Sequence, residues 1–223
     1  MDARQKLDYI LAYYKAPILL GLLALLIVCS AARRQMTKKE PALYLALVNV
    51  SAGDALESRL TKDYIEWSGE DPKKKEVYLY RALYLSDDAS AVNHEYAYAS
   101  RLKLLGAINA KRLDLALMNR EGYDLLSRSG YLADLSQWPD KELRQRLAPY
   151  LTENEVLLED NAIEYNLSEA AEYREITETV CNAVEVTHAP LFREAGFSGP
   201  VYLGVIANSG RSAAFSYLRY LIP

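Results

Sequence analysis

The sequence predicts an α/β domain with a largely parallel sheet, placed after a membrane-spanning helix near the amino terminus. Two observations predict this class. Residues 16–32 form an apolar run without a charge. Beyond Pro41, apolar runs of strand length alternate with segments whose apolar residues follow helical spacing. Such alternation is typical of chains in which helices cover a sheet of mostly parallel strands.

The apolar run gives about 26 Å of helix, slightly less than the roughly 30 Å core of a bilayer. Extending the helix back to Tyr13 closes this gap, because the long side chain of Lys15 can reach the headgroups. The flanking tyrosines suit an interfacial belt. We expect the following organisation: an interfacial segment over 1–12, a transmembrane helix over 13–32, a basic linker over 33–40, and one α/β domain over 41–223.

Three other interpretations of the apolar run stay open. Ser30, Ala31 and Ala32 place small residues where a signal peptidase cuts, which is typical of a cleaved secretory signal. Cys29 suggests a lipoprotein signal, although Leu26-Ile27-Val28 lacks the usual small residue before it. A buried helix of a soluble protein is the last alternative, and such helices rarely lack a polar face.

The charges that flank the run do not decide its orientation. Three basic residues and the terminal amine precede it and four basic residues follow it, so the positive-inside count is nearly tied. The basic residues are Arg4, Lys6 and Lys15 on one side, and Arg33, Arg34, Lys38 and Lys39 on the other.

The first half of the domain alternates clearly. The continuous apolar run over 42–50 predicts a buried strand. After a Ser51 to Asp54 turn, helical spacing predicts a helix over 55–68 that ends at Gly69. A lysine-rich turn then leads to a second strand over 77–85.

The next segments continue this pattern. A long helix is expected over 93–111, a strand over 113–119, and a helix over 121–129 that stops at Gly130. A short apolar segment, 131–135, follows.

The last third is less regular. Two prolines bracket a polar helix over about 140–150. The topology of 151–200 is not predicted, since only short apolar patches occur there. A strand over 200–208 and a helix over 211–221 end the domain, and Gly204 within that strand indicates close packing.

Composition limits the function classes. The chain has a net charge of -4, with 7 Lys/Arg and 3 Asp/Glu in the first 40 residues. The domain is therefore acidic, which argues against a broad nucleic-acid surface. Two cysteines and two histidines suggest neither a disulfide framework nor a metal site, and no cofactor is expected.

We expect no enzymatic activity. The sequence lacks a nucleophile elbow, a glycine-rich phosphate loop and a zinc-protease helix. The carboxylates between Glu153 and Glu164 are interpreted as a solvated face.

Three predicted strands end alike, each with an asparagine followed by turn residues. If the strands were parallel, these residues would surround one crevice at the carboxyl edge of the sheet, where such folds bind ligands. Helix amino termini there favour an anionic or polar guest. Helix capping and turn formation favour the same residues after a strand whatever the protein does, and this is the stronger interpretation, with ligand binding as the alternative. The candidate ligand-binding residues are Asn49, Ser51, Asn119, Arg120, Asn208 and Ser209.

Two segments resemble type 2 periplasmic, or extracellular, solute-binding proteins. Residues 112–135, RLDLALMNREGYDLLSRSGYLADL, resemble a strand and helix that close part of a lobe in that family. Residues 190–197, PLFREAGF, and 201–209, VYLGVIANS, resemble its late strand. The amino-terminal segment 6–15, KLDYILAYYK, is similar to the start of uncharacterised membrane-anchored clostridial proteins.

The resemblance implies a solute-binding-like fold of reduced size, because typical members have two lobes and are longer. It also implies a single-pass protein of the cell membrane whose domain lies outside the cytoplasm. The implied function is to hold a small polar solute and present it to a transporter or sensor. The alternative is a degenerate binding fold that docks on a membrane protein partner and binds no small molecule.

Overall fold

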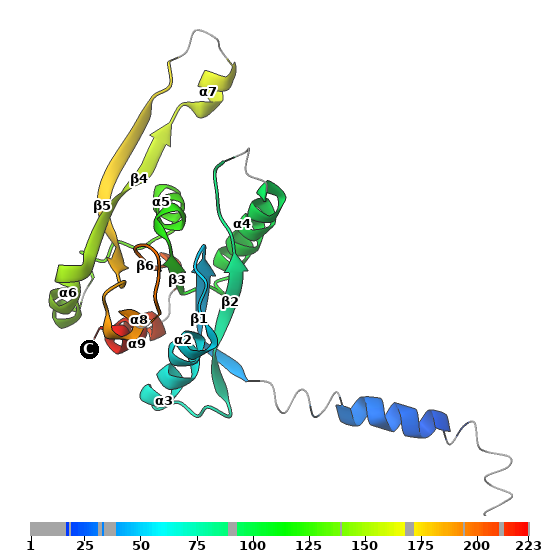
Figure 1. Ribbon diagram of the computed structural model, residues 1–223. Helices are drawn as coiled ribbons and strands as arrows, with labels where there is room; N and C mark the ends of the chain where they lie inside the picture. The colour runs from blue at the N-terminus through cyan, green and yellow to red at the C-terminus, as the bar shows by residue number, and fades with distance from the viewer. Residues whose placement is uncertain are drawn as a thin grey trace, which may run out of the picture. The chain divides into compact units, whose positions relative to one another are not determined.

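The computed structural model describes residues 17, 19–30, 33, 39–88, 93–138, 140–167, 172–193, 195–209 and 212–222. The chain divides into two compact units, 1–40 and 41–223, and each is described by itself. Figure 1 labels the helices and strands.

The first unit contains helical residues over 19–30, all of them exposed. Among the described residues, no helix combines the length and the apolar character that a membrane span requires. The expected interfacial segment 1–12 lies outside the described residues, as do parts of the expected span 13–32 and of the linker 33–40. The membrane anchor therefore stays a prediction.

The second unit is built on a six-stranded mixed sheet with the order β2-β1-β3-β6-β5-β4. The strands are β1 (Glu40–Val48), β2 (Lys75–Leu83), β3 (Leu115–Met118), β4 (Leu151–Asp160), β5 (Glu175–Glu185) and β6 (Tyr202–Val205). The α/β class is confirmed. The expectation of a mostly parallel sheet is wrong, because β6 runs antiparallel to both β3 and β5, and β4 runs antiparallel to β5.

The parallel part of the sheet lies at its other side. β1 pairs with β3 in parallel, with Leu45 beside Leu115. β2 lies on the outer side of β1. It ends at the same edge, where the Asn49 N–H donates to the Leu83 carbonyl at 2.8 Å. The order β2-β1-β3 with a shared carboxyl edge is that of the first strands of a doubly wound sheet.

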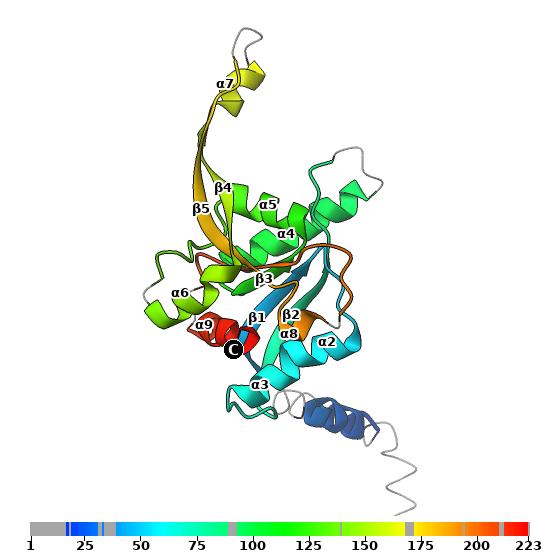
Figure 2. The same cartoon turned by 60° about the vertical axis from the view of Figure 1, so that its left-hand side comes forward.

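Helices cover both faces of the sheet (Figures 1 and 2). The face that carries Leu43, Leu45 and Leu47 packs against one group of helices, and the opposite face of β1, with Ala46 and Val48, packs against another. The first group contains α2 (Asp54–Ser58), η1 (Arg59–Asp63), α3 (Tyr64–Trp67), α6 (Lys141–Leu147), α8 (Pro190–Arg193) and α9 (Ala213–Leu221). The second contains α4 (His94–Asn109) and α5 (Arg120–Arg128).

The leucine side forms the larger core. Alternate residues of β1 and β3 point into it, as the two-residue period of a strand dictates. Tyr217 of α9 is fully buried there and its hydroxyl donates to the Leu60 carbonyl at 2.9 Å. Gly204 in β6 allows the layers to approach, since a Cβ there would lie 2.8 Å from Leu132 and 3.0 Å from Met118. The expectation of close packing at Gly204 is confirmed.

The elements expected before residue 150 are present with shifts of a few residues. The single helix expected over 55–68 is continuous, but its middle turn, η1, is π-helical. The expected stops at Gly69 and Gly130 are confirmed, and both have positive φ. The segment 131–135 contributes only one bridge, between Leu132 and Ile206. The polar helix comprises α6 and the short turn η2 (Ala148–Tyr150).

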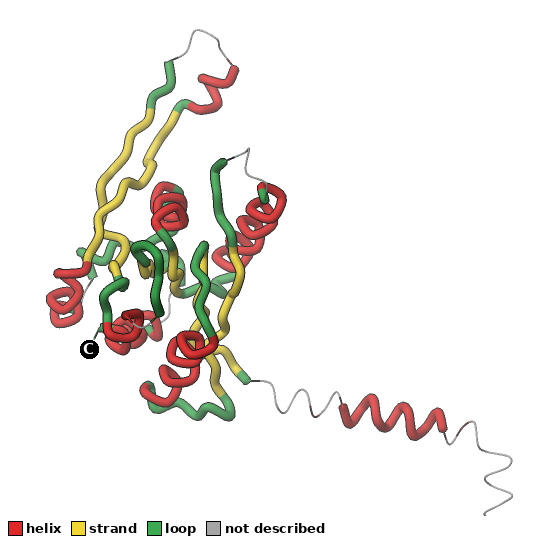
Figure 3. Tube along the Cα trace, in the orientation of Figure 1, coloured by secondary structure: helices red, strands yellow, loops and turns green. Residues whose placement is uncertain are grey.

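The region without a predicted topology forms a long hairpin. β4 and β5 pair from Leu151 with Val184 to Asp160 with Glu175, and α7 (Ala162–Leu167) follows β4 at the far end. Figures 2 and 3 show that this hairpin extends well beyond the rest of the domain. We call residues 151–185 the arm, and residues 156–178 its distal half.

Candidate functional site

Two asparagines predicted to share a site do lie together. Asn49 follows β1 and Asn119 follows β3 at the carboxyl edge of the parallel strands, and the Asn119 N–H donates to the Val48 carbonyl at 3.3 Å. Arg120 is the next residue along, and the exposed Ser51 lies in the loop after β1. Four of the six candidates therefore lie at or just after the carboxyl ends of the parallel strands.

The side chain of Asn49 is bonded within the chain. Its backbone has a φ of 55°, a left-handed conformation that asparagine tolerates. The amide nitrogen donates to the Leu85 carbonyl at 2.7 Å, and the amide oxygen accepts from the Leu85 N–H at 2.7 Å. Asn49 thus replaces a peptide group and fixes the segment that leaves β2.

Asn119 caps a helix. Its side-chain oxygen accepts from the Gly122 N–H at 2.9 Å, at the start of α5. A Cβ on Gly122 would lie 3.0 Å from Val48, so the helix approaches β1 closely at this point. For Asn119 the structure confirms the capping interpretation.

Arg120 lies over two aromatic rings, with its guanidinium 5.5 Å from the centre of the Tyr123 ring and 5.9 Å from that of Tyr202. It also forms an ion pair with Asp124 at 2.9 Å. A hydrogen bond with Tyr202, followed by the carboxylate of Asp124, raises the pKa of Arg120. The guanidinium is therefore held by neighbours in its own chain.

The placement of the last two candidates was wrong. Asn208 and Ser209 follow β6, and β6 is antiparallel to β3, with Leu115 beside Val205 and Met118 beside Tyr202. The carboxyl end of β6 therefore lies at the amino edge of β3, where the Ile206 N–H donates to the Asp114 carbonyl. The crevice expected to hold all three asparagines does not form.

The arm is attached to α5 by a buried polar network. Tyr123, Ser127 and Asn182 are completely buried. The Tyr123 hydroxyl lies 2.9 Å from the side-chain oxygen of Asn182 and 3.0 Å from the Thr152 carbonyl. The Asn182 amide donates to the Ser127 hydroxyl at 2.7 Å, and Ser127 donates to the Glu155 carbonyl at 2.9 Å.

Burial governs the chemistry of this network. Desolvation is the main reason why the pKa of Tyr123 is raised, so the phenol stays protonated as a hydrogen-bond donor. Buried polar groups of this kind are costly unless they are bonded, and here each has a partner. The network therefore fixes both strands of the arm on one helix.

Beyond this attachment, many side chains of the arm are exposed. Arg128 at the end of α5 forms an ion pair with Glu175, and the Tyr173 hydroxyl donates to the same carboxylate at 3.0 Å. Five large apolar or aromatic side chains of the distal half are between 45% and 80% exposed. They are Leu158, Ile163, Tyr165, Tyr173 and Ile176. The rings of Tyr165 and Tyr173 contact each other edge to face, with their centres 5.7 Å apart.

The arm also carries the acidic excess of the domain. Residues 151–185 contain ten Asp/Glu and a single Arg, whereas the rest of 41–223 contains 17 Asp/Glu and 18 Lys/Arg. The exposed carboxylates of β4 include Glu153, Glu155 and Glu159. Within the described part of the chain, no group of three or more His, Cys, Asp or Glu side chains is arranged to hold a metal ion.

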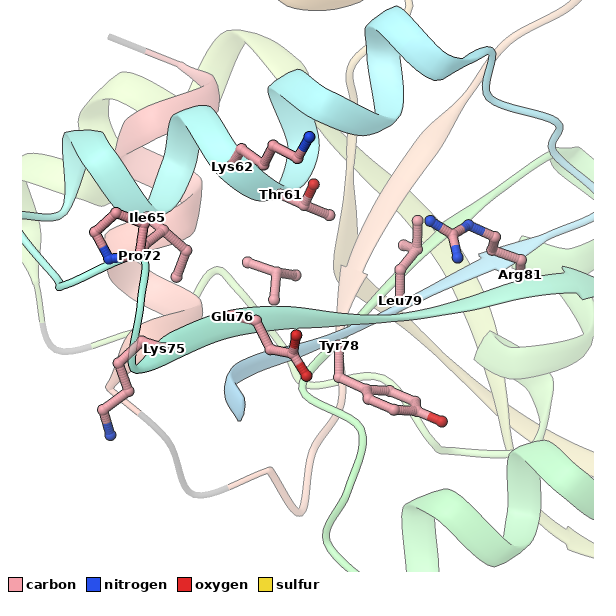
Figure 4. A pocket seen from close by; sticks show the side chains of 10 residues that line it. Thr61, Lys62, Ile65, Pro72, Lys75, Glu76, Tyr78, Leu79 and Arg81 are labelled. Atoms are coloured by element: carbon pink, nitrogen blue, oxygen red, sulfur yellow. The ribbon is translucent and has the colours of Figure 1, made fainter. Parts of the chain in front are cut away.

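A groove of about 400 Å³ lies between the π-helical turn and the outer edge of β2 (Figure 4). Consecutive residues of β2 line it, so the groove follows the edge of the strand and not only one face. The helix side contributes Thr61, Lys62 and Ile65. π-Helical turns occur frequently at functional sites.

Sequence reasoning missed the arm and its attachment. The β-branched residues Ile176, Thr177, Thr179 and Val180 are a strand signal, and they were available in the sequence. Nothing local to Tyr123 or Asn182 indicates that these residues, 59 positions apart, share a hydrogen bond.

Comparisons with known proteins do not assign a family. No protein-family model matches the chain. Neither a curated protein nor a solved structure matches it either. The resemblance to type 2 solute-binding proteins therefore stays a prediction from the two sequence segments that suggested it.

Proposed function

We propose that this chain is a membrane-anchored protein-interaction module, in which the α/β domain holds out an acidic arm that docks on a protein partner. The anchor is the span predicted over 13–32, and the resemblance implies that the domain lies outside the cytoplasm. The partner surface would be basic around an apolar centre. This is the alternative that the sequence left open, with the contact surface now assigned to the arm.

The observation that carries the proposal is the uncovered apolar surface on the distal half of the arm. Contiguous apolar surface that is exposed in a folded domain marks interaction sites. Tyrosine is one of the side chains that contribute most to the binding energy of protein interfaces. Covering the neighbouring aliphatic side chains adds about 25 cal/mol per Å² of apolar area removed from water. The surrounding carboxylates favour a basic partner and oppose an anionic lipid surface.

The rigid attachment of the arm supports the same proposal. A two-stranded hairpin by itself is marginally stable in water. The network of Tyr123, Ser127 and Asn182 ties the near end of this hairpin to α5, and the ion pair of Arg128 with Glu175 extends the attachment into the distal half. Pre-organisation of this kind reduces the entropy lost on binding.

Solute binding is the rival proposal, and the juxtaposition of Asn49, Asn119 and Arg120 favours it. Against it, both amide groups of Asn49 and Asn119 bond within the chain, and Arg120 is paired with Asp124. The two proposals differ in a thermal-unfolding screen of the full chain with sugars, amino acids and short peptides. A solute at 100 times its Kd would add about 2.7 kcal/mol of stability, whereas the interaction module responds to none of them.

Photo-crosslinking tests the docking surface itself. A benzoylphenylalanine is placed at Ile163 on the arm or, as a matched control, at Tyr98 on α4, which is 65% exposed. In cells that make the full chain, illumination is expected to give one discrete protein adduct from position 163 and none from position 98. Reversing the charge of the arm with Glu155→Lys and Glu159→Lys is expected to remove the adduct. No adduct from position 163 would refute the proposal.

A further inference from the structure

Among the described elements, no strand pairs with the outer edge of β2. β2 is the first strand in the sheet order, so only β1 lies beside it. Its residues Tyr78 and Arg81 are exposed, whereas the carbonyl of Ala82, near the end of the strand, accepts a hydrogen bond from the Tyr96 hydroxyl of α4. An unpaired strand edge offers backbone N–H and C=O groups to a further strand.

The groove at this edge combines apolar and basic side chains. Five apolar or aromatic residues line it, together with three cations and one carboxylate. They are Ile65, Pro72, Val77, Tyr78 and Leu79, then Lys62, Lys75 and Arg81, and Glu76. Arg81 is held by Glu57 through two hydrogen bonds, at 2.8 and 2.9 Å. The exposed Lys73 and Lys74 immediately precede β2.

Such a groove suits an extended segment that carries acidic and apolar side chains. Strand addition provides main-chain hydrogen bonds, and alternate side chains of the added strand enter the flanking groove. Lysines beside the edge would attract carboxylates and reject a basic segment. The occupant is therefore an acidic strand with an accessible outer edge.

The chain itself contains a segment of this kind. β4 is the last strand at the other side of the same sheet, so its outer edge has no neighbouring strand among the described elements. Glu155, Leu158, Glu159 and Asp160 of β4 are exposed. The Glu155 carbonyl accepts from Ser127 of α5, so the accessible stretch begins at Val156. Its five residues, Val156 to Asp160, extend about 17 Å at 3.4 Å per residue, with a register irregularity between Leu157 and Glu159.

We infer that the β2 groove of one copy of this chain binds the arm of a second copy, which adds the outer edge of its β4 to the open edge of β2. The inference rests on the proposed function and names the partner of the arm. Because the two surfaces are different, the contact is heterologous and repeats from copy to copy unless a ring closes. The carboxylates of β4 would meet Lys62 and the lysines before β2.

Charge exchange tests this contact in the full chain, kept in a non-ionic detergent. One variant reverses the groove, with Lys62→Glu and Lys74→Glu, and the other reverses the arm, with Glu155→Lys and Glu159→Lys. The matched control, Lys39→Glu with Lys141→Glu, changes two exposed lysines outside the groove. The protein mass per particle is measured by light scattering over a range of concentrations, at about 50 mM and 500 mM salt.

The wild-type chain and the control are expected to assemble as the concentration rises at low salt, and to dissociate at high salt. Each reversed variant alone should associate at least about 100-fold more weakly, since like charges then face each other. An equimolar mixture of the two reversed variants should assemble again, because each arm then meets a groove of opposite charge.

Assembly that the two reversals leave unchanged, or that fails to return in the mixture, would overturn the inference. A wild-type chain that stays a single copy at every concentration would overturn it as well. In that case, an adduct from Ile163 with a different protein would leave the proposed function standing, whereas the absence of any adduct would remove both.

Discussion

The arm has opposite surroundings at its two ends. Near the sheet, Asn182 and Tyr123 are completely buried and bonded to each other through a 2.9 Å contact. In the distal half, Ile163 is 80% exposed and Leu158 is 55% exposed. Polar groups are thus hidden at the attachment, and apolar groups are exposed at the far end.

The two ends of the arm are therefore expected to have different roles: the buried attachment stabilises the fold, and the exposed distal half docks on a partner. A buried hydrogen-bonded network specifies one position for the arm and costs stability when it is broken. Exposed apolar side chains contribute little to the stability of the folded monomer, and a partner that covers them would gain binding energy from them. Substitutions at the two ends should therefore have different consequences.

The largest loss of stability is expected from Asn182→Leu. The change removes the amide that joins Tyr123 to Ser127 and leaves each of the two buried hydroxyls with only one partner, a backbone carbonyl of β4. The free energy of unfolding should fall by about 2–4 kcal/mol. Urea unfolding of the full chain in detergent, followed by the fluorescence of Trp67 and Trp138, measures this loss.

Asn161 provides the matched control for that variant. Its amide also joins two segments of the arm, donating to the Glu172 carbonyl at 2.9 Å and accepting from the Arg174 N–H at 2.7 Å, but both bonds are exposed. Asn161→Leu should cost about 1 kcal/mol or less. Equal losses for the two asparagines would show that burial does not distinguish the ends of the arm.

Tyr123→Phe is expected to have the second largest effect. It removes the hydroxyl that contacts the Thr152 carbonyl and Asn182, and the unfolding free energy should fall by about 1–2 kcal/mol. Tyr165→Phe, at the exposed end, should change it by less than about 0.5 kcal/mol. A Tyr123→Phe variant as stable as the wild type would contradict the role assigned to the network.

Cys181 lies on β5 beside Glu153 of β4, next to the buried Asn182, and is partly exposed. Burial, and then the nearby carboxylate of Glu153, raise the pKa of this thiol. At mildly alkaline pH, Cys181 therefore has a smaller thiolate fraction than a fully exposed cysteine. Glu153→Gln should lower the pKa and speed alkylation by iodoacetamide about threefold at pH 8.5. Glu155→Gln is the control, and an equal acceleration by both variants would contradict the pairing with Glu153.

Ile163→Ser should have the smallest effect on stability, within about 0.5 kcal/mol of the wild type in the same unfolding experiment. The side chain is mostly exposed, and its removal leaves no cavity. A loss above 1.5 kcal/mol would mean that Ile163 packs within its own chain, and the docking role would then lack its basis.

The sequence was sufficient for most of the body of the domain and for its class. Continuous apolar runs produced β1 and β3, and Gly69 and Gly130 end helices at positive φ as expected. The direction of β6 could not be predicted, because the apolar run over 200–208 is compatible with either a parallel or an antiparallel strand. In the structure it is antiparallel to β3, so Asn208 lies at the opposite edge of the sheet from Asn49 and Asn119.

The arm was missed for a different reason, although β-branched residues of β5 were a local strand signal. Its strands are polar on both faces over much of their length, so neither helical nor strand periodicity stands out. The attachment depends on contacts between residues far apart in the chain, such as Ser127 with Asn182. Local propensity says little about such pairs, and only the folded topology brings them together.

The docking role of the arm is tested most directly by the ratio of photo-adduct yields from positions 163 and 98 in the full chain, measured in cells grown and illuminated alike. Both positions are well exposed, so accessibility alone predicts similar yields. If the arm docks on a partner, the yield from position 163 is at least about tenfold higher, and it falls to the level of position 98 when Glu155 and Glu159 are changed to lysine. Equal yields from the two positions in the otherwise wild-type chain would contradict the docking role.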